Sequence, residues 1–202
     1  MASGGGDTGT VDIIGAITSI KGVDLLVFFV LFALFVLGYM QGVVRRLLGI
    51  GTILLSLLVA AQIRTPLGDF LTTNWTQYSP QYDHMIAFGA VFVAGVVGST
   101  IALQLFFKRI PLFANYPVLD EILGGALGLI QGALILAAFF LITDPFFAVT
   151  GAGAQSNEFP FIRQIYEALQ GTVTADIVRN QVVPFVLLFF GALFPPDVTS
   201  LF

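Results

Sequence analysis

Residues 117–145 read PVLDEILGGALGLIQGALILAAFFLITDP, and this stretch decides the fold. Its central part, from Ile122 to Thr143, contains no charged residue. A helix that crosses a bilayer needs about 20 mostly apolar residues, which this part supplies. A membrane β-strand would be shorter and would alternate apolar with polar residues. The stretch therefore predicts a membrane-spanning helix.

The composition extends this prediction to the whole chain. Hydrophobic residues make up 57% of the 202 residues and charged residues only 10%, whereas soluble domains carry about 25% charged residues. So few charges cannot cover the surface of a water-soluble domain. The net charge of −4 offers no basic surface to nucleic acid, and the absence of cysteine excludes disulfides and thiolate metal sites. We expect an all-α integral membrane protein with the lipid bilayer as its main partner.

Three further uncharged stretches have the length of a span, at residues 25–44, 47–63 and 85–107. Together with the stretch at 122–143 they predict a four-helix transmembrane bundle. Very few residues separate the first two spans. We therefore expect a tight helical hairpin there, with Arg45 and Arg46 at its tip.

The connections at the other ends of these helices are also predicted by the sequence. Residues 64–84 are largely polar and predict a long connection between the second and third spans. Asp144 and Pro145 are expected to close the fourth span, because proline cannot continue the hydrogen-bond ladder of a helix.

The C-terminal part is apolar but broken by proline. Residues 180–196 are uncharged, yet Pro184 and the Pro195-Pro196 pair shorten the apolar part below the length of a span. Residues 160–170 are amphipathic. We expect interfacial amphipathic helices at this end, with a fifth span at 180–196 as the alternative. The expected organisation is a disordered or interfacial tail at 1–22, a four-span domain at 23–145 and a C-terminal interfacial helical region at 146–202.

The basic residues near the span ends predict the orientation. Cytoplasmic loops carry the excess of lysine and arginine. Four such residues fall on one side of the membrane, which are Arg45, Arg46, Lys108 and Arg109. The other side has two, Lys21 and Arg64. We expect the Arg45-Arg46 hairpin and the Lys108-Arg109 link in the cytoplasm and both termini outside.

Small residues recur at four-residue spacing in three of the four predicted spans. Glycines four apart lie on one helix face and allow another backbone to approach closely. We expect such helix-packing contacts at six glycines, which are Gly38, Gly42, Gly98, Gly124, Gly128 and Gly132. A gentler stripe of Ala90, Ala94, Gly98 and Ala102 follows the third span.

The candidate functional polar residues are Asp24, Arg45, Asp120 and Gln131. Gln131 lies deepest within its predicted span. We expect it either to form an interhelical hydrogen bond or to contribute to the polar lining of a small pathway. Asp120 is expected to cap its own helix or to pair with the basic residues on the same side. One histidine without cysteine gives no metal site, and no catalytic arrangement or phosphate loop stands out. We therefore expect no enzyme activity, no cofactor and no metal.

Two spaced motifs carry a resemblance. The first places Asp24 before the first span, then Gly38-Tyr39-Met40-Gln41-Gly42, then the basic turn at Arg45. The second runs from Leu119-Asp120 through the glycines of the last span to Asp144. In both motifs and their order the chain resembles the colicin V production (CvpA) family of bacterial inner-membrane proteins, over residues 23–145.

The same comparison shows where the chain departs from that pattern. Family members commonly carry arginine before the second glycine of the first motif and before Gly132, where this chain has Gln41 and Gln131. They often carry glutamate at the position that is Arg46 here.

The resemblance implies a four-helix protein of the bacterial inner membrane, associated with colicin V production or export, biofilm formation and envelope homeostasis. We expect it to act without enzyme activity, through assembly with itself or with other membrane proteins. Two alternatives stay open, a small-solute channel or secondary transporter and an accessory subunit of a larger membrane complex.

Overall fold

The computed structural model describes residues 22–106, 117–147 and 158–194, and these ranges contain helices and short turns but no strand. Four long helices come first, and they are α2 (Gly22–Gln41), α3 (Val43–Asn74), α4 (Pro80–Phe106) and α5 (Pro117–Phe147). Shorter elements follow, which are α6 (Pro160–Leu169), α7 (Val173–Ile177), the π-helical η1 (Val178–Val182), α8 (Val183–Phe190) and the 3₁₀-helical η2 (Gly191–Leu193).

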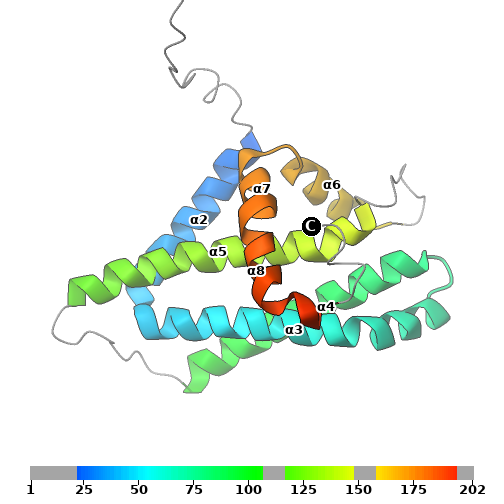
Figure 1. Ribbon diagram of the computed structural model, residues 1–202, viewed down its shortest axis with the longest axis horizontal. Helices are drawn as coiled ribbons and strands as arrows, with labels where there is room; N and C mark the ends of the chain where they lie inside the picture. Colours follow the sequence, from blue (N-terminus) through cyan, green and yellow to red (C-terminus); the bar gives the residue numbers. More distant parts are fainter. Residues whose placement is uncertain (1–21, 107–116, 148–157, 195–202) are drawn as a thin grey trace, which may run out of the picture.

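Helix α5 lies at the centre of the bundle. It packs against α2, α3 and α4, and the other extensive contact joins α3 to α4. Figure 1 shows α3 and α5 running in the same direction along the long axis of the molecule, with α4 returning antiparallel to α3. Helix α2 is antiparallel to α5, because Gly38 faces Gly124 while Leu34, one turn earlier, faces Gly128.

The prediction of a helical hairpin between the first two long helices is wrong in one respect. The connection is as short as expected, a single residue, Gly42, with φ of 77° and ψ of 174°. A positive φ of this kind suits glycine, because it has no Cβ. However, α2 packs along α5 instead of α3, since the turn at Gly42 directs the two helices apart (Figure 1).

Two helices are longer than the sequence predicted. Helix α3 continues past Arg64 and through Pro66 to Asn74, so the predicted polar connection at 64–84 shrinks to a turn at 75–79. The polar side chains that suggested a loop instead bond to carbonyls one turn earlier, as Thr72 does to Gly68 at 3.0 Å. Similarly, α5 continues through Pro145 to Phe147.

The continuation of α5 has a packing reason. A proline removes one backbone donor from the helix, but the two residues after Pro145 bury their rings. Phe146 is 1% exposed and stacks edge-on against Tyr82, with ring centroids 5.3 Å apart, and Phe147 stacks on Tyr166 at 4.6 Å. This burial holds the last turn of α5 in place.

The exposed surface of the long helices is apolar. On α2, Phe28, Phe29 and Phe32 are each more than half exposed. A soluble protein rarely exposes so continuous an apolar surface, whereas lipid-facing helices require it. The buried core lies among α3, α4, α5 and the C-terminal helices.

Five helical stretches in the described ranges are long and apolar enough to cross a membrane, one more than the four expected. They are Gly22–Gln41, Val43–Asn74, Pro80–Leu103, Val118–Phe147 and Val173–Leu193. The fifth combines α7, η1, α8 and η2 into one helical stretch. Figure 1 shows it crossing α3 and α5 at a steep angle instead of running beside them.

Candidate functional site

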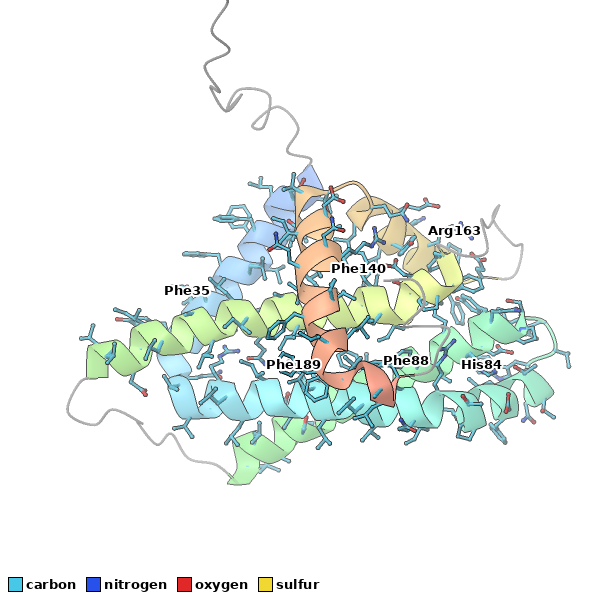
Figure 2. The ribbon with its side chains drawn as sticks, viewed as in Figure 1. Phe35, His84, Phe88, Phe140, Arg163 and Phe189 are labelled. Atoms are coloured by element: carbon cyan, nitrogen blue, oxygen red, sulfur yellow. The ribbon has the colours of Figure 1, made fainter. Side chains whose placement is uncertain are left out.

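The first feature of the candidate site is the glycine seam between α2 and α5. A Cβ added at Gly124 would lie 2.6 Å from the Gly38 carbonyl oxygen, and one at Gly128 would collide with the Leu34 carbonyl oxygen. A Cβ at Gly132 would meet the Leu31 side chain at 2.6 Å. The glycines thus bring the two backbones into direct contact, as small residues do in membrane helices. Beside them, the ring of Phe35, labelled in Figure 2, covers Gly125.

The expectation that Gly98 packs against another helix needs correction. No heavy atom lies within 4 Å of a Cβ built at Gly98, and Ala90, Ala94 and Ala102 of the same stripe are exposed. Helix α4 turns a different face to α3, where Gly95 contacts Ser56. The small-residue stripe of α4 therefore faces outward.

At the start of α3, Asp120 lies against Gly42. Asp120 is 2% exposed, and a Cβ at Gly42 would collide with its Oδ2. Because α5 begins at Pro117, Asp120 does not occupy the N-cap position of its own helix that we expected. Its carboxylate instead lies at the N-terminus of α3, where the helix dipole favours negative charge.

One turn further along α3, Arg46 joins three helices. It is 5% exposed, and its Nη1 donates a short hydrogen bond to Gln131 Oε1 of α5. Its Nη2 lies 3.4 Å from the Leu34 carbonyl oxygen of α2. Gly49 leaves room for Gln131, whose Nε2 would lie 3.2 Å from an added Cβ. The structure therefore places Gln131 in an interhelical hydrogen bond. Arg45, which precedes Arg46 in the chain, is half-buried.

Replacing Gln131 by leucine should lower the free energy of unfolding by about 1 kcal/mol, the scale of interhelical hydrogen bonds in membranes. The physical reason is that Arg46 loses its side-chain acceptor while remaining buried. Thermal unfolding in detergent, followed by circular dichroism, measures the change. Gln181→Leu, at an exposed position, is the matched control, and an equal melting temperature for the two variants would contradict this expectation.

Asp24 connects the start of α2 to the C-terminal helices. It is 8% exposed, and its Oδ1 lies 3.2 Å from Thr174 Oγ1 and 3.4 Å from the Thr174 backbone nitrogen. Thr172, the N-cap of α7, accepts from the backbone of Ala175 at 3.1 Å. Asp24 therefore fixes α7 against α2, which the sequence did not predict.

A partly buried ion pair at the end of α5 was also missed. Arg179 Nη2 lies 2.6 Å from Asp144 Oδ1, and its Nε lies 3.0 Å from Oδ2. The guanidinium carbon lies 4.2 Å from the centre of the Phe140 ring, a cation–π contact. The available signal was that Arg179 is the one cation in the apolar stretch 173–193.

Arg179 belongs to the π-helical segment η1. Such segments are rare and frequently occur at functional sites. Here the wider turn accompanies the bidentate contact with Asp144, and a hydrogen bond at 3.4 Å extends from Arg179 to the Tyr166 hydroxyl of α6. Three elements, α5, α6 and η1, therefore meet around this ion pair.

The environment of Tyr166 predicts an alkaline transition. Burial, and then the Asp144 carboxylate, raise the pKa of Tyr166 from 10.0 to about 12. Because the folded state holds the Tyr166 proton more tightly, the contribution of this residue to stability is constant below pH 10 and falls as the pH rises from 10 toward 12. Absorbance of tyrosinate should include a step near pH 12, and Tyr166→Phe should remove that step. A titration unchanged by Tyr166→Phe would contradict this assignment.

A second cluster of polar contacts lies at the start of α6. Arg163 donates to Glu158 Oε2 from Nη2 at 2.6 Å and from Nε at 2.8 Å, and its Nη1 lies 3.6 Å from Glu167. The backbone nitrogen of Phe159 donates to the Tyr82 hydroxyl at 2.8 Å. Figure 2 shows Arg163 and His84 at the same end of the molecule, on α6 and α4.

The remaining ionisable groups at this end lie between α3 and α4. His84 Nε2 is 3.1 Å from Asp69 Oδ1, and the Arg64 guanidinium lies 5.9 Å from the Phe88 ring centre. Asp83 is fully buried. Within the described ranges, no group of three or more His, Asp or Glu residues could hold a metal ion.

These features define a helical multi-pass membrane protein with close glycine contacts and buried charges at the helix ends. The chain belongs to the colicin V production protein family, whose sequence model matches residues 23–167. A colicin V production protein homolog of Haemophilus influenzae is 30% identical over 108 residues, which is 53% of this chain and 63% of that protein. The match thus spans less than two thirds of that relative. No solved structure matches this chain.

Proposed function

We propose that this chain supports colicin V production, or a related task of envelope maintenance, export or biofilm formation, as a non-enzymatic protein of the bacterial inner membrane. The observation that carries the proposal is the family match, which runs from the first turn of α2 through α3, α4 and α5 into α6. Arg46, Arg163 and Arg179, which are buried or partly buried, contact side chains of this chain. Such contacts favour a role in building the bundle over a role in chemistry.

The outward face of α4 supports action through assembly. Ala90, Ala94, Gly98 and Ala102 form a stripe of small residues that is exposed in this chain. Stripes of this spacing let membrane helices approach closely. The proposed partners are a second copy of the chain or another membrane protein, which includes the possibility that the chain is a subunit of a larger complex.

The proposed topology places the start of α3, with Arg45 and Arg46, on the cytoplasmic side. Basic residues at the span ends support this orientation, although Lys108 and Arg109 lie outside the described residues. The chain lacks cysteine, so single cysteines can report the topology cleanly. A cysteine at Gln77, in the turn between α3 and α4, should react with a membrane-impermeant maleimide in intact cells, whereas one at Arg45 should not.

A matched pair of glycine variants tests the proposed function. The gene is deleted in a bacterium that secretes colicin V, and killing zones are measured after complementation with the parent chain, Gly98→Leu or Gly51→Leu. Both glycines have open space around an added Cβ, but only Gly98 lies on the α4 stripe. We expect the parent and Gly51→Leu to restore the zone and Gly98→Leu to reduce both the zone and co-purification of a partner.

Two results would overturn the proposal. Full colicin V production without the gene would remove the assigned role. Solute flux in proteoliposomes that disappears in Gln131→Leu would favour a channel or transporter instead, although Gln131 accepts a hydrogen bond from Arg46 here.

A further inference from the structure

Two apolar grooves lie beneath α6, one on each side of α5. The α4 groove, of about 520 Å³, lies between α4, α5 and α6, where Ile86, Phe139 and Ile162 contribute to its wall. The α2 groove, also of about 520 Å³, lies between α2, α5 and α6, where Val27 and Leu169 do so. Ile135 of α5 and Ile165 of α6 line both grooves.

Helix α6 is attached at a few points and extends over these grooves. The Tyr166 ring stacks on Phe147 at 4.6 Å, and the Arg163 guanidinium lies 5.2 Å from the centre of the same ring. In contrast, Phe161 and Ile165, which border the grooves, remain 59% and 48% exposed. The charged side chains of α6 thus bond on its polar face, while its apolar face covers grooves that the described residues do not fill.

Neither water nor empty space suits such grooves. A water needs two to four polar partners, and the one polar side chain in the walls, Thr143, already donates to the Phe139 carbonyl oxygen at 2.8 Å. An empty groove would forfeit the dispersion contacts of its walls. Both volumes fall within the range of about 300–1,000 Å³ that ligand sites occupy.

The position of the grooves identifies their occupant. Their walls come from α2, α4 and α5, which are apolar enough to cross the bilayer, so the grooves open into lipid. The abundant apolar molecules there are acyl chains. We propose that α6 covers two acyl-chain sites, and that phospholipid chains bound in them attach α6 to the bundle. This proposal does not rest on the role in colicin V production.

Native mass spectrometry of the full chain tests the proposal. The chain is purified in dodecyl maltoside, mixed with phosphatidylethanolamine and phosphatidylglycerol, and the phospholipid molecules retained per chain are counted. Gly89→Leu fills the α4 groove, because an added Cβ would lie at ordinary contact distance, 3.7 Å, from Ile142. Ala168→Phe fills the α2 groove from α6. Gly51→Leu adds the same leucine at an open position away from both grooves.

We expect the parent and Gly51→Leu to retain phospholipid and each groove variant to retain at most half as much. We also expect added phospholipid to raise the melting temperature of the parent by more than that of either groove variant. Two variants on different helices keep the test decisive if one of them does not fold. Equal retention in all four proteins, or a bound peptide in place of phospholipid, would overturn the proposal.

Discussion

Arg179→Leu should destabilise the folded chain by about 3–5 kcal/mol, the range for removing one partner of a buried ion pair. The Asp144 side chain is only 5% exposed, and its two oxygens lie 2.6 and 3.0 Å from the Arg179 guanidinium. Without that guanidinium the carboxylate stays buried and loses its bidentate partner. Thermal or denaturant unfolding in dodecyl maltoside measures the loss.

A double-mutant cycle separates the ion pair from simple packing. The double variant Asp144→Leu/Arg179→Leu removes both charges and should recover part of the stability that Arg179→Leu loses. The control is Asp69→Leu, which removes the carboxylate bonded to His84 Nε2; the Asp69 side chain is 69% exposed, so we expect a smaller loss. If the double variant is no more stable than Arg179→Leu, the cost comes from lost packing on Phe140 and not from the unpaired charge.

The sequence predicted four of the five long apolar helices because their signal is local. An uncharged apolar run of the right length identifies a span without knowledge of its neighbours. The ends were less well predicted for the same reason. Pro66 and Pro145 indicate helix ends locally. However, the helices continue past them, and packing between residues far apart in sequence, such as Phe146 against Tyr82, stabilises the continuation.

The glycine spacing identified a face but not its partner. Gly124, Gly128 and Gly132 share one side of α5 by spacing alone, whereas the identity of the facing helix depends on how α2 leaves Gly42. The spacing of Ala90, Ala94 and Gly98 is the same, and this face is exposed. A periodic pattern therefore reports that close contact is possible, and the fold decides whether it is made within the chain.

The polar contacts could not be predicted because they join residues far apart in sequence. Asp144 and Arg179 are 35 residues apart, and Arg46 and Gln131 are 85 apart. Positions 46 and 131 are also two of those at which the chain departs from the pattern it resembles. The structure joins the two side chains by a hydrogen bond.

Gly128→Leu should destabilise the bundle by about 1–3 kcal/mol, the usual cost of overpacking a close contact. A Cβ at Gly128 would collide with the Leu34 carbonyl oxygen and would lie 3.4 Å from the Gly38 Cα. These are backbone atoms, which cannot rotate away as a side chain can. The leucine must therefore push α2 away from α5. This displacement should also break the hydrogen bond from Arg46 to the Leu34 carbonyl oxygen.

Gly191→Leu provides the matched control for this prediction. The atom nearest to a Cβ at Gly191 is Leu187 Cβ at 3.8 Å, an ordinary contact, so the same substitution should cost clearly less there. Melting temperatures of the two variants in detergent decide the matter. If Gly128→Leu melts like the parent chain, α2 and α5 do not hold each other through this seam, because no rearrangement of side chains alone could accommodate a leucine against the Leu34 backbone.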